Sequence, residues 1–249
     1  MGLNLDGLHV TVDHSHNRLL NTGKAGNPTV RAIADLRVFS VFQRLKAPNS
    51  MSRHHGQRPN TGDNCHLLYA LKGKGGLTTD VLSIKRLLEY FDGILDDIYA
   101  LSAGYDLVVS MPSNHNISHI LGRRLARKFN CSHLQSVFDK ISVTDARNLL
   151  QNANLDRQTR QGLTFRLKQF KGHEDFPLKC ISTEHRHLFP PITQNPRFPL
   201  PGSNYTKIML ADDLLSTGTT LLEARRLLKL VFPAADVDAT CLFGAVAGD

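Results

Sequence analysis

The segment from Asp212 to Thr220 joins an acidic pair to a loop rich in hydroxyl groups, and both parts can do chemistry. The loop residues are Ser216, Thr217, Gly218, Thr219 and Thr220. Backbone N–H groups and side-chain O–H groups of such a loop can converge on an anion at the positive end of a following helix. The segment therefore predicts a phosphate-binding loop. An ordinary turn with a Ser or Thr helix cap would explain Thr217 or Thr219, but not the acidic pair.

The acidic pair, Asp212 and Asp213, needs its own explanation because carboxylates repel a bare phosphate. Carboxylate oxygens accept hydrogen bonds from ribose hydroxyls, and they also suit a magnesium ion. A ligand that carries a ribose 5-phosphate group satisfies both the carboxylates and the loop.

The elements around this segment predict how it is held. Ile208–Ala211 is short and continuously apolar, as is typical of a strand buried on both faces of a parallel sheet. Apolar residues then recur at helical spacing after the loop, at Leu221, Ala224, Leu228 and Val231. The chain is therefore expected to run strand, loop, helix.

A second strand, loop and helix is expected upstream. Asp106–Met111 reads as a buried strand, and an apolar residue recurs every fourth position from Ile117 to Phe129. The loop between them consists of Pro112, Ser113, Asn114, His115 and Asn116. A plain connection capped by Ser113 or Asn116 is the alternative to a binding loop here.

The pattern Asp-Asp-x-x-Ser/Thr-Thr-Gly-x-Thr after an apolar strand resembles the phosphoribosyl pyrophosphate (PRPP) loop of the type I phosphoribosyltransferases. The resemblance implies an α/β fold with a central, mostly parallel sheet flanked by helices, a smaller hood and an N-terminal extension. It also implies that Asp212 and Asp213 are the catalytic pair that holds the ribose hydroxyls, and that residues 216–220 bind the 5-phosphate. By the same resemblance, residues 112–116 meet the pyrophosphate, and Mg²⁺ arrives with PRPP and can lie near the two aspartates.

Within that family the chain is most similar to the competence-associated ComF-like subfamily. Three segments carry this resemblance: Leu67–Gly75, Asp106–Pro112 and Ile208–Glu223. Two features depart from the subfamily. Its N-terminal cysteine cluster for zinc is absent, and its Arg-rich stretch after the Pro loop is replaced by a shorter segment with His115 and His119.

The expected function is transfer of phosphoribose from PRPP to an unidentified acceptor, with release of pyrophosphate. Two alternatives stay open. One is a regulator that binds PRPP or a nucleotide but has lost the chemistry. The other is an effector or DNA-processing accessory that acts with nucleic-acid or protein partners.

Composition is consistent with a globular α/β protein. The chain has 249 residues, of which 41% are hydrophobic, and its formal net charge is +8. This charge favours an anionic partner, either the phosphates of PRPP or a nucleic acid. Four cysteines stand singly, which predicts reduced thiols. No apolar run is long enough to cross a membrane, so we expect a cytoplasmic protein. The family resemblance also implies a homodimer, since these enzymes commonly form dimers.

We expect two parts along the chain: residues 1–64 as an N-terminal extension and linker, and residues 65–249 as the phosphoribosyltransferase-like domain. An insertion at about 131–205 is predicted to be either a basic lid over PRPP or a solvated helical pair. Residues 182–205 are rich in proline, which predicts an irregular segment.

Four further elements are predicted from local patterns. Leu8–Val12 reads as a strand and Val30–Leu45 as a helix, whereas Ala47–Asn64 reads as a polar linker. Thr79–Leu101 reads as a long amphipathic helix, with an interruption expected near Gly93.

Overall fold

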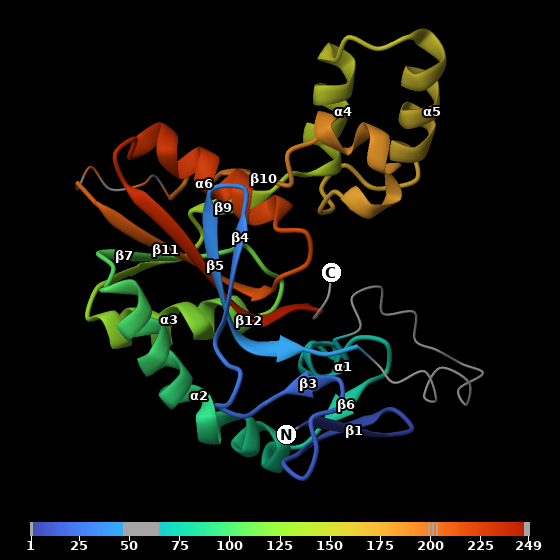
Figure 1. The fold of residues 1–249 in the computed structure, drawn as a ribbon. Coiled ribbons are helices and arrows are strands. Elements are labelled where there is room, and N and C mark those ends of the chain that lie inside the picture. Colours follow the sequence, from blue (N-terminus) through green and yellow to red (C-terminus); the bar gives the residue numbers. More distant parts are fainter. Residues whose placement is uncertain (1, 47–64, 199, 201, 203, 247–249) are drawn as a thin grey trace.

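The computed structural model describes residues 2–46, 65–198, 200, 202 and 204–246. The predicted linker Ala47–Asn64 lies outside these residues. Within them, the fold is α/β: a central, mostly parallel sheet lies between helices, and two smaller sheets accompany it (Figure 1). The predicted fold class is confirmed at this level.

The central sheet has seven strands in the described part of the chain, in the order β3-β5-β12-β11-β7-β8, with β4 also paired to β5. Four neighbouring pairs, from β5 to β8, are parallel, whereas β3 and β4 run antiparallel to β5. The strands are β3 (Leu20–Asn21), β4 (Thr29–Ile33), β5 (Leu36–Arg44), β7 (Leu107–Ser110), β8 (Ser132–Leu134), β11 (Lys207–Leu214) and β12 (Asp236–Val246).

The strands of the two smaller sheets alternate in sequence with those of the central sheet. One small sheet contains β1 (Gly2–Asp6), β2 (His9–Asp13) and β6 (Thr78–Thr79); the other contains β9 (Phe138–Lys140) and β10 (Ile192–Gln194). The predicted strand Leu8–Val12 is thus confirmed as β2, one residue later than expected.

The helices are α1 (His66–Leu71), α2 (Val81–Ser102), α3 (Ile117–Phe129), α4 (Val143–Asn152), α5 (Arg157–Leu167) and α6 (Thr219–Val231), with the 3₁₀ helices η2 (Leu178–Cys180) and η3 (Thr183–Leu188). The helices predicted before Phe129 and after the Thr220 loop are confirmed. So is the long helix α2, which runs through Gly93 without the expected interruption.

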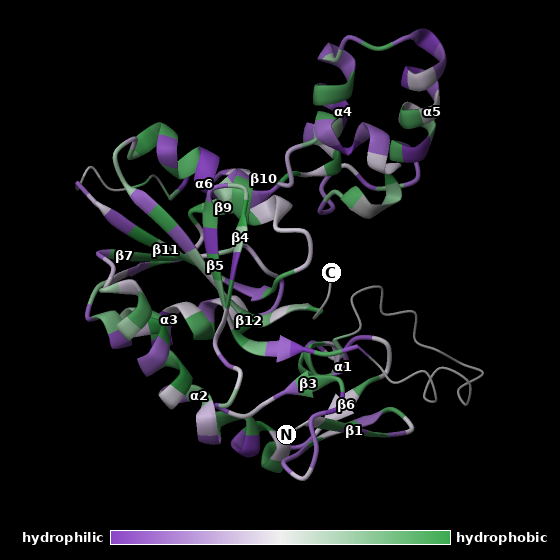
Figure 2. Ribbon diagram, in the orientation of Figure 1, coloured by the Kyte–Doolittle hydropathy of each residue, from purple (hydrophilic) through white to green (hydrophobic). Residues whose placement is uncertain are grey.

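Alternate residues of β11 point into two different cores. Met209 and Ala211 pack with residues of α1, α2 and α3, whereas Ile208 and Leu210 pack with residues of α6. This alternation follows from the two-residue period of a strand. Figure 2 shows the matching concentration of hydrophobic residues along the central strands. Both faces are covered by helices, so the functional groups of the strands emerge at the strand ends.

The predicted helix Val30–Leu45 is wrong, because these residues form the hairpin of β4 and β5. The turn lies between Ile33 and Leu36, where Ala34 has a φ of 51°. β5 contains two valines and two phenylalanines, and β-branched and aromatic side chains pack well on a sheet buried on both faces. Residues that we expected in an N-terminal extension therefore contribute strands to the central sheet.

Residues 141–189 have a core of their own. Side chains from α4, α5 and the two 3₁₀ helices pack together, and this cluster is separate from the two cores of the central sheet. Figure 1 shows α4 and α5 standing away from that sheet. The region therefore contains the predicted helical pair, and its action as a lid stays a prediction.

The proline-rich segment 182–205 is more ordered than expected. It contains η3 and the short strand β10, although irregular structure connects them. Pairing of β10 with β9 supplies the backbone hydrogen bonds that a proline-rich sequence does not supply locally.

No helix in the described residues is both long enough and apolar enough to cross a membrane.

Candidate functional site

The two predicted binding loops meet at one edge of the central sheet. β7 and β11 are adjacent parallel strands, with Ser110 opposite Ala211. Their carboxyl ends therefore lie side by side, and the loops that lead into α3 and α6 leave from the same edge. This is where ligands bind in open α/β sheets.

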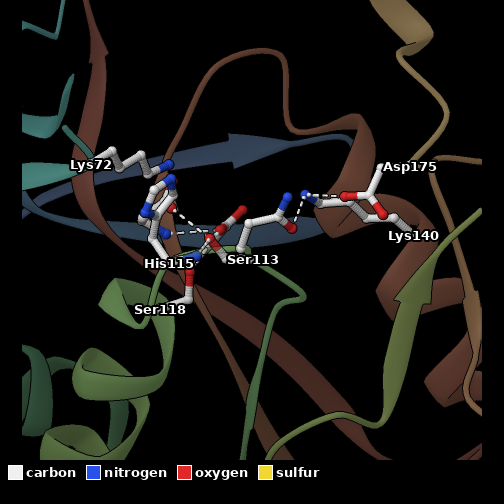
Figure 3. A network of polar contacts seen from close by, with 9 residues as sticks. Lys72, Ser113, His115, Ser118, Lys140 and Asp175 are labelled. Atoms are coloured by element: carbon white, nitrogen blue, oxygen red, sulfur yellow. Dashed lines mark hydrogen bonds and ion pairs between the residues drawn. The ribbon is translucent and has the colours of Figure 1, made fainter. Parts of the chain in front are cut away.

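Asp213 contacts Lys72 and Ser113, two members of the polar network drawn in Figure 3. Its Oδ2 is 2.6 Å from Nζ of Lys72, which follows α1, and 3.4 Å from the hydroxyl of Ser113, which donates to it. The side chains of Lys72 and Asp213 are only 15% and 10% exposed. The ion pair is thus largely removed from water, and it ties α1 to the end of β11.

Asp212 occupies a different environment. Its Oδ1 accepts the backbone N–H of Asp213 at 2.8 Å and the hydroxyl of Ser118, in α3, at 3.3 Å. Burial, together with the negative charge of Asp213, raises the pKa of Asp212 to about 7. The two carboxylates therefore differ: Asp213 has a lysine partner at 2.6 Å, whereas Asp212 is held by hydrogen bonds.

The acidic pair lies inside β11, and not after its end at Ala211 as predicted. Pairing with β12 continues through Asp212, opposite Cys241, to Leu214, opposite Phe243. The run of apolar side chains ends at Ala211, whereas the backbone pairing with β12 continues to Leu214, because the last side chains of the strand have reached the edge of the core.

The predicted phosphate loop begins at a fixed point. The N–H of Leu215 donates to the carbonyl of Phe243 at 2.8 Å, and the carbonyl of Leu215 accepts Nη2 of Arg44 at 2.8 Å. Arg44 is buried at the end of β5. A buried cation thus anchors the backbone just before the loop.

Gly218 forms the N-cap of α6 with a φ of 77°, a left-handed conformation that favours glycine. A Cβ on this residue would lie 2.6 Å from Cδ1 of Ile33, so a larger residue would also displace the end of this side chain of the neighbouring β4. The hydroxyls of Thr217 and Thr219 contact each other at 2.9 Å. Since Gly218 has no side chain to cap α6, the start of this helix suits an external anion.

The loop after β7 lines a pocket of about 280 Å³, which includes all five predicted residues from Pro112 to Asn116. Lys140, in β9, faces them: its Nζ is 3.1 Å from Oδ1 of Asn114 and 3.3 Å from Oδ2 of Asp175. Figure 3 shows Lys140 lying between this loop and Asp175. Lys140, which we did not assign to the pyrophosphate, therefore contacts the loop that we did assign to it.

The residues that the prediction missed are Lys72, Ser118, Lys140 and Arg44. Lys72 lies in the segment Leu67–Gly75 that resembles the ComF-like subfamily, so a signal for it existed. Lys140 lies in the insertion that we predicted as a possible basic lid over PRPP, but no pattern linked it to residues 112–116, and Ser118 had no such signal. Arg44 had no signal, because its strand was predicted to be a helix.

Among the described residues, no group of three or more His, Cys, Asp or Glu could hold a metal ion. At Asp213 a lysine already provides the positive charge. These residues do not form a resident magnesium site on their own, so a magnesium ion here would have to bring most of its ligands with it, as an ion bound to a pyrophosphate does.

No protein-family model and no curated protein matches the chain. The resemblance to the type I phosphoribosyltransferases therefore stays a prediction.

Proposed function

We propose that this protein binds PRPP with Mg²⁺ and transfers phosphoribose to an acceptor, with release of pyrophosphate. We further propose that its sheet is that of the type I phosphoribosyltransferases, with residues 141–189 in the position of a hood or lid.

The observation that carries the proposal is the meeting of Lys72, Ser113 and Asp213. Each residue lies in, or directly after, one of the three segments in which the sequence resembles the ComF-like subfamily. Asp213 contacts Lys72 at 2.6 Å and Ser113 at 3.4 Å. These segments are far apart in the chain, so their convergence is independent of the local patterns. A site of shared function accounts for it.

Each part of PRPP has a matching part of the site. The 5-phosphate suits the loop from Ser216 to Thr220 and the start of α6, where N–H groups and the helix dipole favour an anion. The ribose hydroxyls suit Asp212 and Asp213. The pyrophosphate suits the pocket lined by residues 112–116, on the neighbouring strand end.

The reaction follows from these positions. As the bond between C1 and the pyrophosphate oxygen breaks, the ribose gains the character of an oxocarbenium ion, as in glycoside hydrolysis. The carboxylates beside the ribose favour this positive charge, and Lys140 is the cation beside the pocket proposed for the departing pyrophosphate. Ribose hydroxyls would replace Lys72 at Asp213, and the released ammonium would then face the ligand's phosphates.

One observation favours a second candidate, a regulator that binds PRPP or a nucleotide without turnover. Among the described residues that line the pocket after β7, Lys140 is the one lysine or arginine, and it is balanced by Asp139 and Asp175. This is a weak electrostatic environment for a leaving pyrophosphate.

The test combines binding with turnover. PRPP with Mg²⁺ should raise the melting temperature, because a ligand that binds only the folded state stabilises it. Pyrophosphate release should then be followed with pooled bases, nucleotides and nucleic acids as acceptors. Release that depends on one acceptor supports the transferase. Binding without release from any pool supports the regulator, and an unchanged melting curve at millimolar PRPP rejects both.

A further inference from the structure

The inserted region, residues 141–189, carries positive charge that the protein does not neutralise. From residue 157 to residue 173 the sequence has no aspartate or glutamate, and its cations are Arg157, Arg160, Arg166, Lys168 and Lys171. Among the described residues, none of these five forms an ion pair. The main body differs: Arg124 and Lys128 of α3 pair with aspartates of α2. The charge of the inserted region is therefore available to an anionic partner.

The arginines of α5 bind neutral groups. Arg160 donates to three backbone carbonyls at the end of α4, at 2.7 to 3.0 Å, and Arg166 donates to the carbonyl of Cys180 at 2.9 Å. Asp156, the nearest carboxylate in sequence, caps α5 by accepting the N–H of Thr159 at 2.9 Å. A pocket of about 340 Å³ between α4 and α5 has three cations and no carboxylate among its described lining residues. These contacts fix the arginines without cancelling their charge.

On the opposite side of α5 lies an open, mostly apolar groove of about 470 Å³. Its lining residues are Gly162, Phe165, Arg166, Gln169, Phe170 and Cys180. Phe165 is 68% exposed, so its ring is available for contact. Gln161 precedes it by four residues and Lys168 follows it by three, and both are exposed, so they lie on the same face of the helix. An aromatic ring, an amide and a cation thus adjoin one another at the edge of the groove.

Gly162 has no role in the fold that explains its presence inside α5. A glycine inside a helix destabilises the helix relative to alanine. Here a Cβ would meet no atom within 4 Å, so no neighbouring group requires the glycine. Its missing side chain instead keeps the groove open beside Phe165. The groove therefore has room for a flat ring.

We propose that this face of α5 binds single-stranded nucleic acid, with a base stacked on Phe165 beside Gly162 and phosphates near Arg157 and Lys168. Aromatic side chains next to a cationic track bind single strands in this way without sequence preference. An acidic protein helix would match the charge, but it would need a row of apolar residues, and Phe165 is the one large apolar residue that α5, described in full, exposes. The inference is independent of the proposed function, because it uses none of the residues assigned to PRPP.

The probe is a fluorescein-labelled 12-nucleotide single strand of mixed sequence, as DNA and as RNA in separate arms, titrated by fluorescence anisotropy at 50 and 200 mM NaCl. Wild-type affinity should fall about twentyfold between these salt concentrations if three phosphates are contacted. Phe165→Ala should weaken single-strand binding at least about fivefold, the lower limit for loss of one stacked base. Binding of the duplex of the same sequence should not change, because its paired bases cannot stack on Phe165. The arm that binds more tightly identifies the sugar of the strand.

Two further variants separate the charge from the groove. Arg157→Gln with Lys168→Gln should reduce the slope of log affinity against log salt by about 1.4, the value for two phosphate contacts. Gly162→Leu should raise the melting temperature by about 2 °C, since leucine favours a helix, yet weaken single-strand binding about fivefold by filling the groove. A purely structural role of Gly162 would not give these opposite effects.

The controls lie outside the inserted region. Phe198→Ala removes another exposed phenylalanine, and Lys85→Gln with Arg127→Gln makes the same charge change on exposed residues of α2 and α3. The first should keep the wild-type affinity and the second the wild-type salt slope. Absence of single-strand binding at 50 mM NaCl, or equal losses in Phe165→Ala and Phe198→Ala, overturns the inference. Poly-L-glutamate tests for an acidic protein partner: displacement of the strand at equal charge concentration, with no effect of Phe165→Ala, also overturns it.

Discussion

The two strand-loop-helix units at the edge of the sheet are alike in plan but differ in how they are held. After β11, the loop is fixed by buried groups: Lys72 pairs with Asp213, Arg44 holds the carbonyl of Leu215, and Gly218 lies against Ile33. After β7, Ser113 also reaches Asp213, but the ion pair beside the loop is exposed: Lys140 and Asp175 have side chains that are 37% and 50% exposed.

This difference separates two tasks. A rigid, pre-formed loop loses little entropy when it binds a ligand, so the β11 unit suits the part of the ligand that stays bound. The β7 unit, with its exposed ion pair and histidines, can adjust its contacts. Under the proposed function, it therefore suits the pyrophosphate, which must arrive with the substrate and leave.

The largest effect on ligand binding should come from removing both carboxylates of the β11 unit. In the wild type, PRPP with Mg²⁺ should stabilise the folded state by about 2.7 kcal/mol at a ligand concentration one hundred times the dissociation constant. The double variant Asp212→Asn with Asp213→Asn should lose this stabilisation. Thermal melting with and without the ligand measures it. Asp92→Asn with Asp96→Asn makes the same charge change on exposed aspartates of α2 and should keep the full shift. Equal shifts in both double variants would mean that the ribose site is misassigned.

The next prediction compares how much one ion pair from each unit contributes to the unfolding free energy. Lys72→Met leaves Asp213 buried and unpaired, so it should cost about 3 kcal/mol of unfolding free energy. Lys140→Met removes an exposed pair and should cost less than about 1 kcal/mol. Urea unfolding of the ligand-free proteins measures both. Similar costs for the two variants would contradict the contrast between a buried and an exposed unit.

A pH effect should mark Asp212. Its pKa is raised from 3.8 to about 7 in the folded protein, so the folded state holds a proton that the unfolded state loses. The folded state is therefore favoured most below pH 4, and its stability relative to Asp212→Asn should fall as the pH rises to about 7. The slope should be up to about 1.4 kcal/mol per pH unit, and it should vanish above pH 7.

This slope is measured by urea unfolding of wild type and Asp212→Asn from pH 4 to pH 8, without ligand. A difference that stays constant over this range, or that grows in favour of the wild type, would show that Asp212 is ionised throughout.

A small loss of stability, about 1 kcal/mol, should come from Gly218→Ala, because a Cβ both strains the left-handed backbone and meets Ile33. Gly104→Ala is the matched control: its φ is also positive, but no atom lies within 4 Å of the added Cβ. The extra cost at Gly218 should disappear when Ile33→Ala is combined with it. If Gly218→Ala and Gly104→Ala cost the same, the contact with β4 does not shape the loop.

The sequence predicted the parts of the site that lie within continuous patterns. The acidic pair, the glycine loop and both flanking helices could be found because an apolar strand and a helical period surround them. Lys140 could not, because its place beside Asn114 depends on how β9 pairs with β10. Contacts between distant segments leave no local period.

The helix predicted at Val30–Leu45 failed for a related reason. Runs of valine and phenylalanine satisfy a helical period as well as a strand when both faces are buried, and the turn at Ala34 has no glycine or proline to mark it. This error hid β5, and with it the buried Arg44 that anchors Leu215. An incorrect element therefore removed a site residue as well as a strand.

The pairing of β9 with β10 has a consequence for the modularity of this protein. Lys140 is opposite Ile192, so the chain leaves the main body and returns to it at neighbouring points, and everything between them is a detour. The detour packs on its own core, while Phe138 and Ile192 belong to the core beneath α6. A short hairpin turn could close this gap. The inserted region is thus a part that evolution or an engineer could exchange without rebuilding the central sheet that positions the candidate site.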